Sequence, residues 1–99
     1  MSQEKPARGI HHLKSDPIYF AAVLQKRLPF QIRNDDRKFD EGDEVVLHEW
    51  SRDRASSREA DGYTGRTVRG TVTFVHHPEN LPKGVVAAGY VVLGISWNM

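Results

Sequence analysis

The sequence predicts a mainly β fold of the α+β class, with one or two short helices, in which a helix near the N-terminus caps a small β-barrel or sandwich. Three observations lead to this prediction. The chain has 99 residues, of which 38% are hydrophobic, and this is enough for one compact core. Several short segments alternate apolar and polar side chains, as half-buried strands do. One early segment combines a helix-start signal with helical spacing of its apolar residues.

The N-terminal segment predicts a leader and then a first strand. Residues 1–9 are polar, contain proline and glycine, and show no periodicity. We therefore expect a disordered leader over 1–9, followed by a single domain over 10–99. A short strand is expected over 10–14.

A helix is expected over 17–26. Residues 15–17 read Ser-Asp-Pro, so a side chain able to cap a helix precedes a proline at the first helical position, where the missing N–H costs nothing. Pro29 prevents the helix from continuing. The side chains expected to face the core are those of Phe20, Val23 and Leu24.

The middle of the chain predicts two strands. Residues 30–33 alternate apolar and polar side chains, as a half-buried strand should. A charged loop over 34–38 and a tight turn at 41–43 lead to a second strand over 44–50. Its alternation places on one face Val45, Leu47 and Glu49, and on the other Val46, His48 and Trp50.

The last third predicts the longest strand and a closing strand. The longest strand is expected over 66–76, after a mobile loop over 51–61 and a turn at 62–65. The closing strand, over 90–97, is apolar on both faces, which is typical of a strand inside a sheet. The side chains expected to share one face of the longest strand are Val68, Val72 and Phe74.

Composition excludes several classes of protein. The chain has no cysteine, which rules out a disulfide scaffold, a thiolate zinc site and a cysteine nucleophile. No apolar run is long enough to span a membrane, so we expect a cytoplasmic protein with no membrane partner. We also expect a monomer. The formal net charge of +1 argues against a polycationic tail but is compatible with a local basic groove.

The five histidines raise the question of a metal site. They are His11, His12, His48, His76 and His77. Neighbouring residues on a strand point to opposite faces, so each His-His pair offers one ligand to a given site. No close spacing of His, Asp and Glu stands out. We therefore expect no metal and no other cofactor.

Basic and aromatic residues favour a role in binding nucleic acid or a nucleotide. Residues 33–38 bring arginines and carboxylates together, and guanidinium forks match phosphates and base edges. Trp50 precedes the loop over 51–61, and Tyr63 and Arg66 follow it. Exposed aromatic rings stack on the bases of single strands. The alternative is a solvated turn, with Trp50 packed in the core and Tyr63 covering one end of the barrel.

Catalytic signatures are absent from the sequence. Neither a Gly-x-Ser-x-Gly elbow nor a glycine-rich phosphate loop of the standard forms occurs. Glu49, at the end of a strand, would serve as a general acid or base if it were buried in a site. A carboxylate in this position is more commonly the ion-pair partner of a nearby Arg or Lys.

A series of motifs follows a fixed order along the chain. They are His11-x-Leu13-Lys14, Pro17-x-Tyr19-Phe20-x-Ala22-Val23, Phe30-x-Ile32-Arg33-x-Asp35-Asp36-Arg37-x-Phe39, Gly42-Asp43, Glu49-Trp50, Gly62-Tyr63-Thr64-Gly65-Arg66 and Gly89-Tyr90-Val91-Val92-Leu93. In this order and spacing they resemble a small branch of the ASCH family, which belongs to the PUA-like superfamily of RNA-associated β-barrels. The resemblance covers residues 11–96.

The resemblance implies a PUA-like barrel of five or six strands, with an RNA-binding cleft beside the first helix. Some ASCH relatives are enzymes, and their amidohydrolase branch takes its catalytic Lys and nucleophilic Thr from a Gly-Arg-Lys-Thr-x-Thr-x-Arg run. In this chain Leu28 and Gln31 stand at those two positions, and neither side chain supports that chemistry. Lys26 or Arg27 would have to supply the missing cation, so a role without catalysis is favoured.

We therefore expect an RNA- or nucleotide-binding module with an Arg- and aromatic-lined cleft. The expected nucleic-acid-binding residues are Lys14, Arg33, Asp36, Arg37, Glu49, Trp50, Tyr63 and Arg66. In this hypothesis the cations contact phosphates or base edges, the rings stack, and the carboxylates orient the arginines. One alternative is a hydrolase acting on RNA or a modified nucleoside, with Glu49 as acid or base and Lys14 or Lys26 as the cation. Another is a protein-interaction adaptor using residues 85–88 or 51–61.

Overall fold

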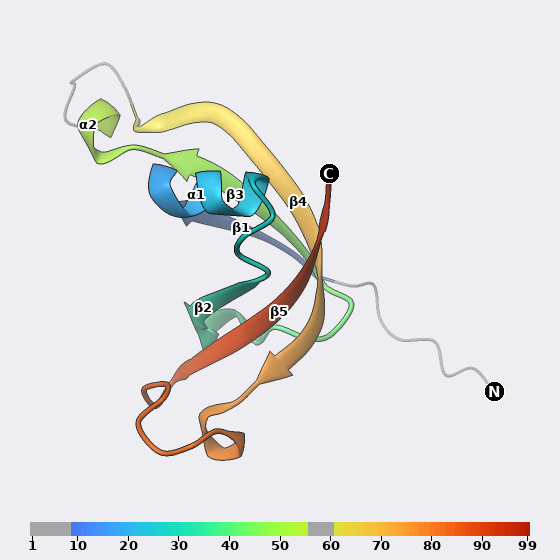
Figure 1. Ribbon diagram of the computed structural model, residues 1–99. Helices are drawn as coiled ribbons and strands as arrows, with labels where there is room; N and C mark the ends of the chain where they lie inside the picture. Colours follow the sequence, from blue (N-terminus) through green and yellow to red (C-terminus); the bar gives the residue numbers. More distant parts are fainter. Residues whose placement is uncertain (1–8, 56–60) are drawn as a thin grey trace.

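One curled β-sheet forms the centre of the computed structural model, which describes residues 9–55 and 61–99 (Figure 1). The elements, in chain order, are β1 (Ile10–Ser15), α1 (Pro17–Leu24), β2 (Phe30–Asn34), the 3₁₀ helix η1 (Asp35–Arg37), β3 (Glu44–Trp50), α2 (Arg52–Ala55), β4 (Tyr63–His76), the 3₁₀ helix η2 (Pro78–Asn80) and β5 (Tyr90–Asn98). The fold is mainly β with two short α-helices, as the sequence predicts, and the sheet forms a half-barrel.

Two predicted segments fall partly outside the described residues. The expected leader lies outside them except for Gly9. In the expected loop over 51–61, the chain forms the short helix α2, and residues 56–60 are outside the described part. None of the helices in the described ranges is long and apolar enough to cross a membrane.

The strands follow the order β1-β3-β4-β5-β2 in the sheet. β1 pairs with β3 in parallel, whereas the other neighbouring strands are antiparallel. β5 lies between β4 and β2, which confirms the prediction that a strand with two apolar faces is inside the sheet. β1 and β2 are the two edge strands, and their backbones do not pair with each other.

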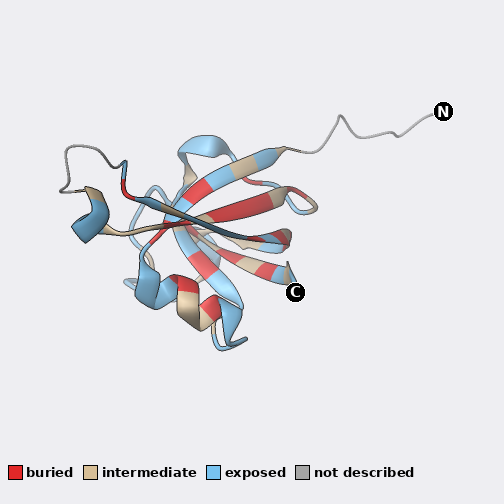
Figure 2. Ribbon diagram, turned by 90° about the horizontal axis from the view of Figure 1, so that it is seen from above, coloured by how far each residue is buried: buried red, intermediate tan, exposed pale blue. Residues whose placement is uncertain are grey.

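The core lies between the concave side of the sheet and α1. Val45 and Leu47 of β3 are completely buried, and so is Leu93 of β5. Phe20 and Val23 close the core from α1. Figure 2 shows the buried parts of the strands and of one helix in red. As predicted for β3, Glu49 shares the buried face with Val45 and Leu47. On the other face His48 and Trp50 are half-buried, but Val46 is buried as well.

Helix α1 is shorter than the sequence predicts. Pro17 takes the first helical position as expected, but the side chain of the N-cap residue Asp16 makes no capping hydrogen bond. The helix ends at Leu24, because Lys26 has a left-handed backbone (φ 61°) and the N–H groups of Lys26 and Arg27 bond back to the last helical turn. The prediction that Leu24 faces the core is wrong, since its side chain is 37% exposed.

Strand β4 ends at His76 as predicted, but it differs from the prediction at its start and in the facing of its second half. The segment 62–65 was expected to form a turn, yet β4 begins at Tyr63, which pairs with Trp50 of β3. The pairing with β5 shifts register between Val72 and Phe74, which marks a β-bulge. An extra residue exchanges the two faces of a strand, so Phe74 is 51% exposed and Val75 packs against the core instead.

Strand β2 has its polar face toward the interior. Gln31 is buried and Arg33 is half-buried, whereas Phe30 and Ile32 are 41% and 55% exposed. A half-buried strand normally buries its apolar face, so the orientation of β2 is opposite to the one that its alternation indicates. The polar face of β2 is directed toward the edge of β1, and this arrangement creates the candidate site.

Candidate nucleic-acid interface

A groove runs between the two edge strands. It consists of two adjoining hollows, of about 460 and 630 Å³, which share Lys14 and Arg33. The first hollow is further lined by Ser15, Asp16, Tyr19, Leu28, Phe30, Gln31, Ile32 and Trp50. The second is further lined by His12, Leu13, Arg37, His48 and Tyr63. The first hollow is therefore rich in apolar and aromatic side chains, and the second in basic ones.

Two arginines connect the β2 side of the groove to the edge of β1. Arg33 Nη2 donates to the carbonyl oxygen of Lys14 at 2.8 Å, and Arg37 Nη1 donates to the carbonyl oxygen of His12 at 2.9 Å. These side-chain bonds join β1 and β2 where no strand pairing does. Because a guanidinium has five N–H donors, each arginine keeps further donors for the groove.

Among the described residues, Arg33 forms no close ion pair with a carboxylate. Burial lowers the pKa of Arg33 and the nearby Arg37 lowers it further, while Asp16 acts in the opposite direction. A guanidinium stays protonated at neutral pH, so the groove holds a partly buried positive charge that an anion would stabilise.

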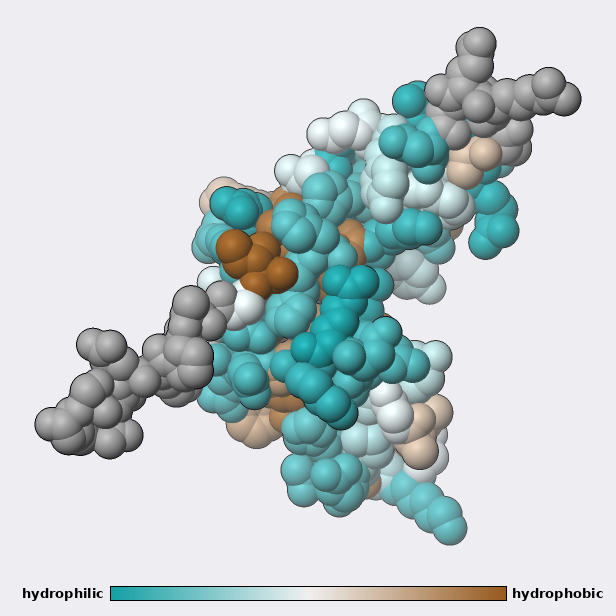
Figure 3. All heavy atoms as spheres, turned by 180° about the vertical axis from the view of Figure 1, so that it is seen from behind, coloured by the Kyte–Doolittle hydropathy of each residue, from teal (hydrophilic) through white to brown (hydrophobic). Residues whose placement is uncertain are grey.

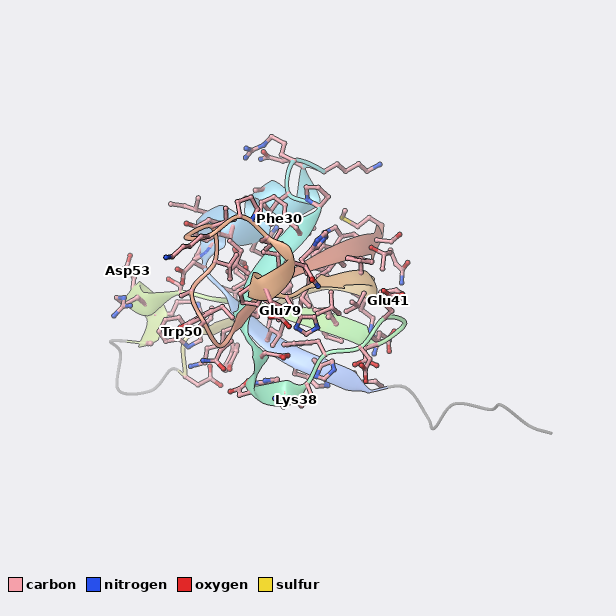
Figure 4. The ribbon with its side chains drawn as sticks, turned by 90° about the horizontal axis from the view of Figure 1, so that it is seen from below. Phe30, Lys38, Glu41, Trp50, Asp53 and Glu79 are labelled. Carbon is pink, nitrogen blue, oxygen red and sulfur yellow. The ribbon has the colours of Figure 1, made fainter. Side chains whose placement is uncertain are left out.

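Trp50 and Tyr63 form the wall near the end of β3. Trp50 Nε1 donates to the carbonyl oxygen of Asp61 at 3.0 Å, and Lys14 Nζ lies 4.8 Å from the centre of the indole ring. Figure 4 shows Trp50 at the end of β3, on the side of the molecule where Asp53 of α2 lies. Trp50 is half-buried and Tyr63 is 37% exposed, so both rings belong to the groove and neither to the core.

The neighbouring histidines His11 and His12 point in opposite directions, as the sequence predicts. His11 Nε2 bonds to the buried carboxylate of Asp43 at 2.8 Å. His12 Nδ1 lies 2.9 Å from His48 Nε2, and both of these rings line the groove. Among the described residues, no three His, Cys, Asp or Glu side chains are grouped in a way that could hold a metal ion.

Three of the expected site residues do not line the groove. Asp36 is exposed, with its carboxylate 4.0 Å from Arg37 Nε. Glu49 is 8% exposed and accepts a hydrogen bond from Thr64 Oγ1 at 2.8 Å, with Arg66 Nε at 3.7 Å. The Arg66 guanidinium also lies over the ring of Phe20, 5.2 Å from its centre. Glu49 and Arg66 therefore belong to a cluster that fastens β4 to β3 and α1.

Ten groove residues were not among the expected site residues, and besides Ser15 and Asp16 four of them bear a ring nitrogen, a hydroxyl or an amide. These four are His12, Tyr19, Gln31 and His48. The histidines meet because β1 and β3 pair in parallel, and no local pattern carries that register. Gln31 gave a weak signal, as a polar residue between two apolar ones on a strand, but only the curl of the sheet turns it inward.

Comparison with known proteins gives a family. Residues 10–95 match the family described as "Domain of unknown function (DUF3850)". The chain is also similar to the "Uncharacterized 12.9 kDa protein in GpA 3'region" of Escherichia phage P2, at 33% identity over 66 residues. That alignment covers 67% of the chain and 53% of the phage protein, so the chain spans about half the length of this relative. Because the family match extends over most of the chain, the protein belongs to the DUF3850 family.

Proposed function

We propose that the protein binds RNA or a nucleotide in the groove between β1 and β2. The observation that carries this proposal is the partly buried charge of Arg33, which forms no ion pair among the described residues, with Lys14 and Arg37 beside it. A phosphate would supply the anion, and guanidinium groups bind phosphates through paired hydrogen bonds. The resemblance to RNA-associated barrels implies the same kind of ligand.

The arginines are held in place before a ligand arrives. Arg33 and Arg37 are anchored on backbone oxygens of β1, so binding would cost less side-chain entropy than it would for freely moving arginines. Lys14 lies over the Trp50 ring, which puts a cation and an aromatic surface next to each other. One nucleotide would use both, its phosphate on the cations and its base against the ring.

The hydrolase alternative has less support from the geometry. Glu49, the expected acid or base, is buried against Thr64 and Arg66 and does not line the groove. Of the cations expected for this alternative, Lys14 lines the groove, whereas Lys26 lines a separate hollow with Pro29 and Trp97. The adaptor alternative names residues 85–88, and there Val85 is 58% exposed. The face in Figure 3 is mostly hydrophilic, with its hydrophobic residues in small areas.

The test replaces Arg37, because Arg37 is 48% exposed and its loss should leave the core intact. We expect Arg37→Ala to weaken binding of a fluorescein-labelled single-stranded RNA several-fold. The slope of log K against log salt should become less negative by about 0.7, the value for one lost contact to a single-stranded phosphate chain. Fluorescence anisotropy at several salt concentrations measures both quantities.

The matched control is Arg27→Ala. The Arg27 side chain is exposed, bonds only to Gln25 among the described residues, and does not line the groove, so the substitution removes the same charge elsewhere. This variant should bind like the wild type. Wild-type protein that binds no RNA, or equal losses in the two variants, would contradict a site in the groove.

A further inference from the structure

Gln31 is the most deeply buried polar side chain that lines the groove from β2. The side chain of Gln31 is 6% exposed. It lines the first hollow together with Arg33 and with apolar and aromatic side chains such as Leu28 and Trp50. A buried amide normally has partners for both its oxygen and its nitrogen. The partners of Gln31 therefore indicate what the hollow is suited to hold.

The amide of Gln31 has a fixed orientation. Its Oε1 accepts a hydrogen bond from Arg33 Nη2 at 3.0 Å, and because a guanidinium is only a donor, the oxygen must face Arg33. Among the described residues, Gln31 Nε2 has no acceptor. Every fully buried side-chain nitrogen or oxygen of these residues has a hydrogen-bond partner, so Nε2 is not fully buried. The NH₂ group of Gln31 is therefore open to the hollow, with two N–H donors unused.

Arg33 supplies a second donor group next to this amide. Its Nη2 serves the carbonyl oxygen of Lys14 and Oε1 of Gln31, which occupies both N–H groups of that nitrogen. Nη1 and Nε have no protein acceptor among the described residues. A carbonyl oxygen has two lone pairs and can accept from an amide and a guanidinium together, whereas an amino group, itself a donor, is rejected.

We propose that Gln31 reads the base of the bound RNA by donating to the O4 keto oxygen of uracil, and so selects uridine over cytidine. This inference rests on the RNA-binding function proposed above. Uracil and cytosine have the same size, so the apolar walls of the hollow contact both equally. They differ where uracil has an oxygen and cytosine an amino group, and single-stranded bases are recognised on that edge.

The experiment compares labelled hexauridylate and hexacytidylate, measured by fluorescence anisotropy at one salt concentration. We expect the wild-type protein to bind hexauridylate at least about fivefold more tightly, as a hydrogen bond made or missed to a buried donor would give. Gln31→Glu keeps the oxygen that faces Arg33 and replaces the NH₂ group by an acceptor. This variant should lose the preference for uridine or reverse it.

The matched control is Gln25→Glu. Gln25 is exposed at the end of α1, its Oε1 also accepts from an arginine, and it does not line the groove. The substitution adds the same charge, so any general repulsion of RNA appears in both variants. Gln25→Glu should keep the preference of the wild type.

The outcomes separate this inference from the proposed function. Wild-type protein that binds both oligomers equally, or Gln31→Glu that keeps the preference, overturns the role of Gln31 while RNA binding stands. Wild-type protein that binds neither oligomer overturns both. Should Gln31→Glu not unfold cooperatively, wild-type ¹⁵N NMR decides: the side-chain NH₂ signals of Gln31 must shift with hexauridylate, and unchanged signals at saturation overturn the inference.

Discussion

Gly62 and Trp50 are the residues whose contact fixes one wall of the groove. Gly62 has a positive φ of 95°, and a Cβ built on it would overlap the edge of the Trp50 indole. The indole is thus held between this backbone and Lys14. The position of an aromatic ring in the groove depends on one glycine that does not itself line it.

We expect Gly62→Ala to destabilise the protein by more than about 1 kcal/mol, because it combines backbone strain with displacement of Trp50. Gly65→Ala is the control, since Gly65 also has a positive φ (93°) but nothing lies within 4 Å of an added Cβ. Urea unfolding gives the two stabilities, and tryptophan fluorescence reports the ring. An equal loss of stability in both variants would show that contact with Trp50 contributes nothing.

At the scale of the elements, the β-bulge in β4 decides which side chains reach the core. Before the bulge, Val68 and Val72 are buried; after it, Val75 takes the inner face and Phe74 the outer one. A strict alternation over the whole strand would have put Phe74 inside. The bulge lets the long strand bend with the curl of the sheet and still contribute to one core.

This arrangement predicts opposite outcomes for two substitutions in β4. Val72→Ala should destabilise the protein by about 1–3 kcal/mol, because Val72 is 1% exposed and the change leaves a cavity. Phe74→Ser should cost less than about 1 kcal/mol, although it removes more atoms, because Phe74 is half-exposed. Denaturant unfolding compares them; a larger loss for Phe74→Ser would contradict the position of the bulge.

At the scale of the whole molecule, one buried carboxylate ties the start of β1 to the turn before β3. Asp43 accepts hydrogen bonds from His11 Nε2 at 2.8 Å, from the Asp40 N–H at 3.0 Å and from the Gly9 N–H at 3.2 Å. Burial alone raises the pKa of Asp43, but the bonds from His11, Asp40 and Gly9 outweigh it, so its pKa lies below the ordinary value.

This shift predicts how stability depends on pH. An unfolded aspartate has a pKa of about 3.9. Because the folded pKa of Asp43 is lower, the carboxylate stabilises the fold fully at any pH above the unfolded pKa. The contribution is lost as pH falls through the folded pKa. We expect Asp43→Asn to cost about 1–3 kcal/mol at pH 7 and to flatten the decline of stability below about pH 4. Urea titrations from pH 2 to pH 7 test this, and a decline as steep as in the wild type would contradict it.

The candidate site was partly predictable from residue chemistry. Lys14, Arg33, Arg37, Trp50 and Tyr63 were expected site residues and do line the groove, because basic and aromatic side chains outside a core are left at the surface. Glu49 was expected in the site as well, but alternation already placed it on the same face as Val45 and Leu47. It lies there, bonded to Thr64, on the buried side.

The sequence by itself determined the class of fold, the order of α1 and the five strands along the chain, the interior place of β5 and the opposed directions of His11 and His12. Each follows from the local geometry of the backbone, which neighbouring residues already specify. Only the tertiary structure decided the parallel pairing of β1 with β3, the inward turn of Gln31 and the bridges from Arg33 and Arg37 to β1. These depend on contacts between distant segments, where the curl of one sheet, rather than any local pattern, sets which side chains meet.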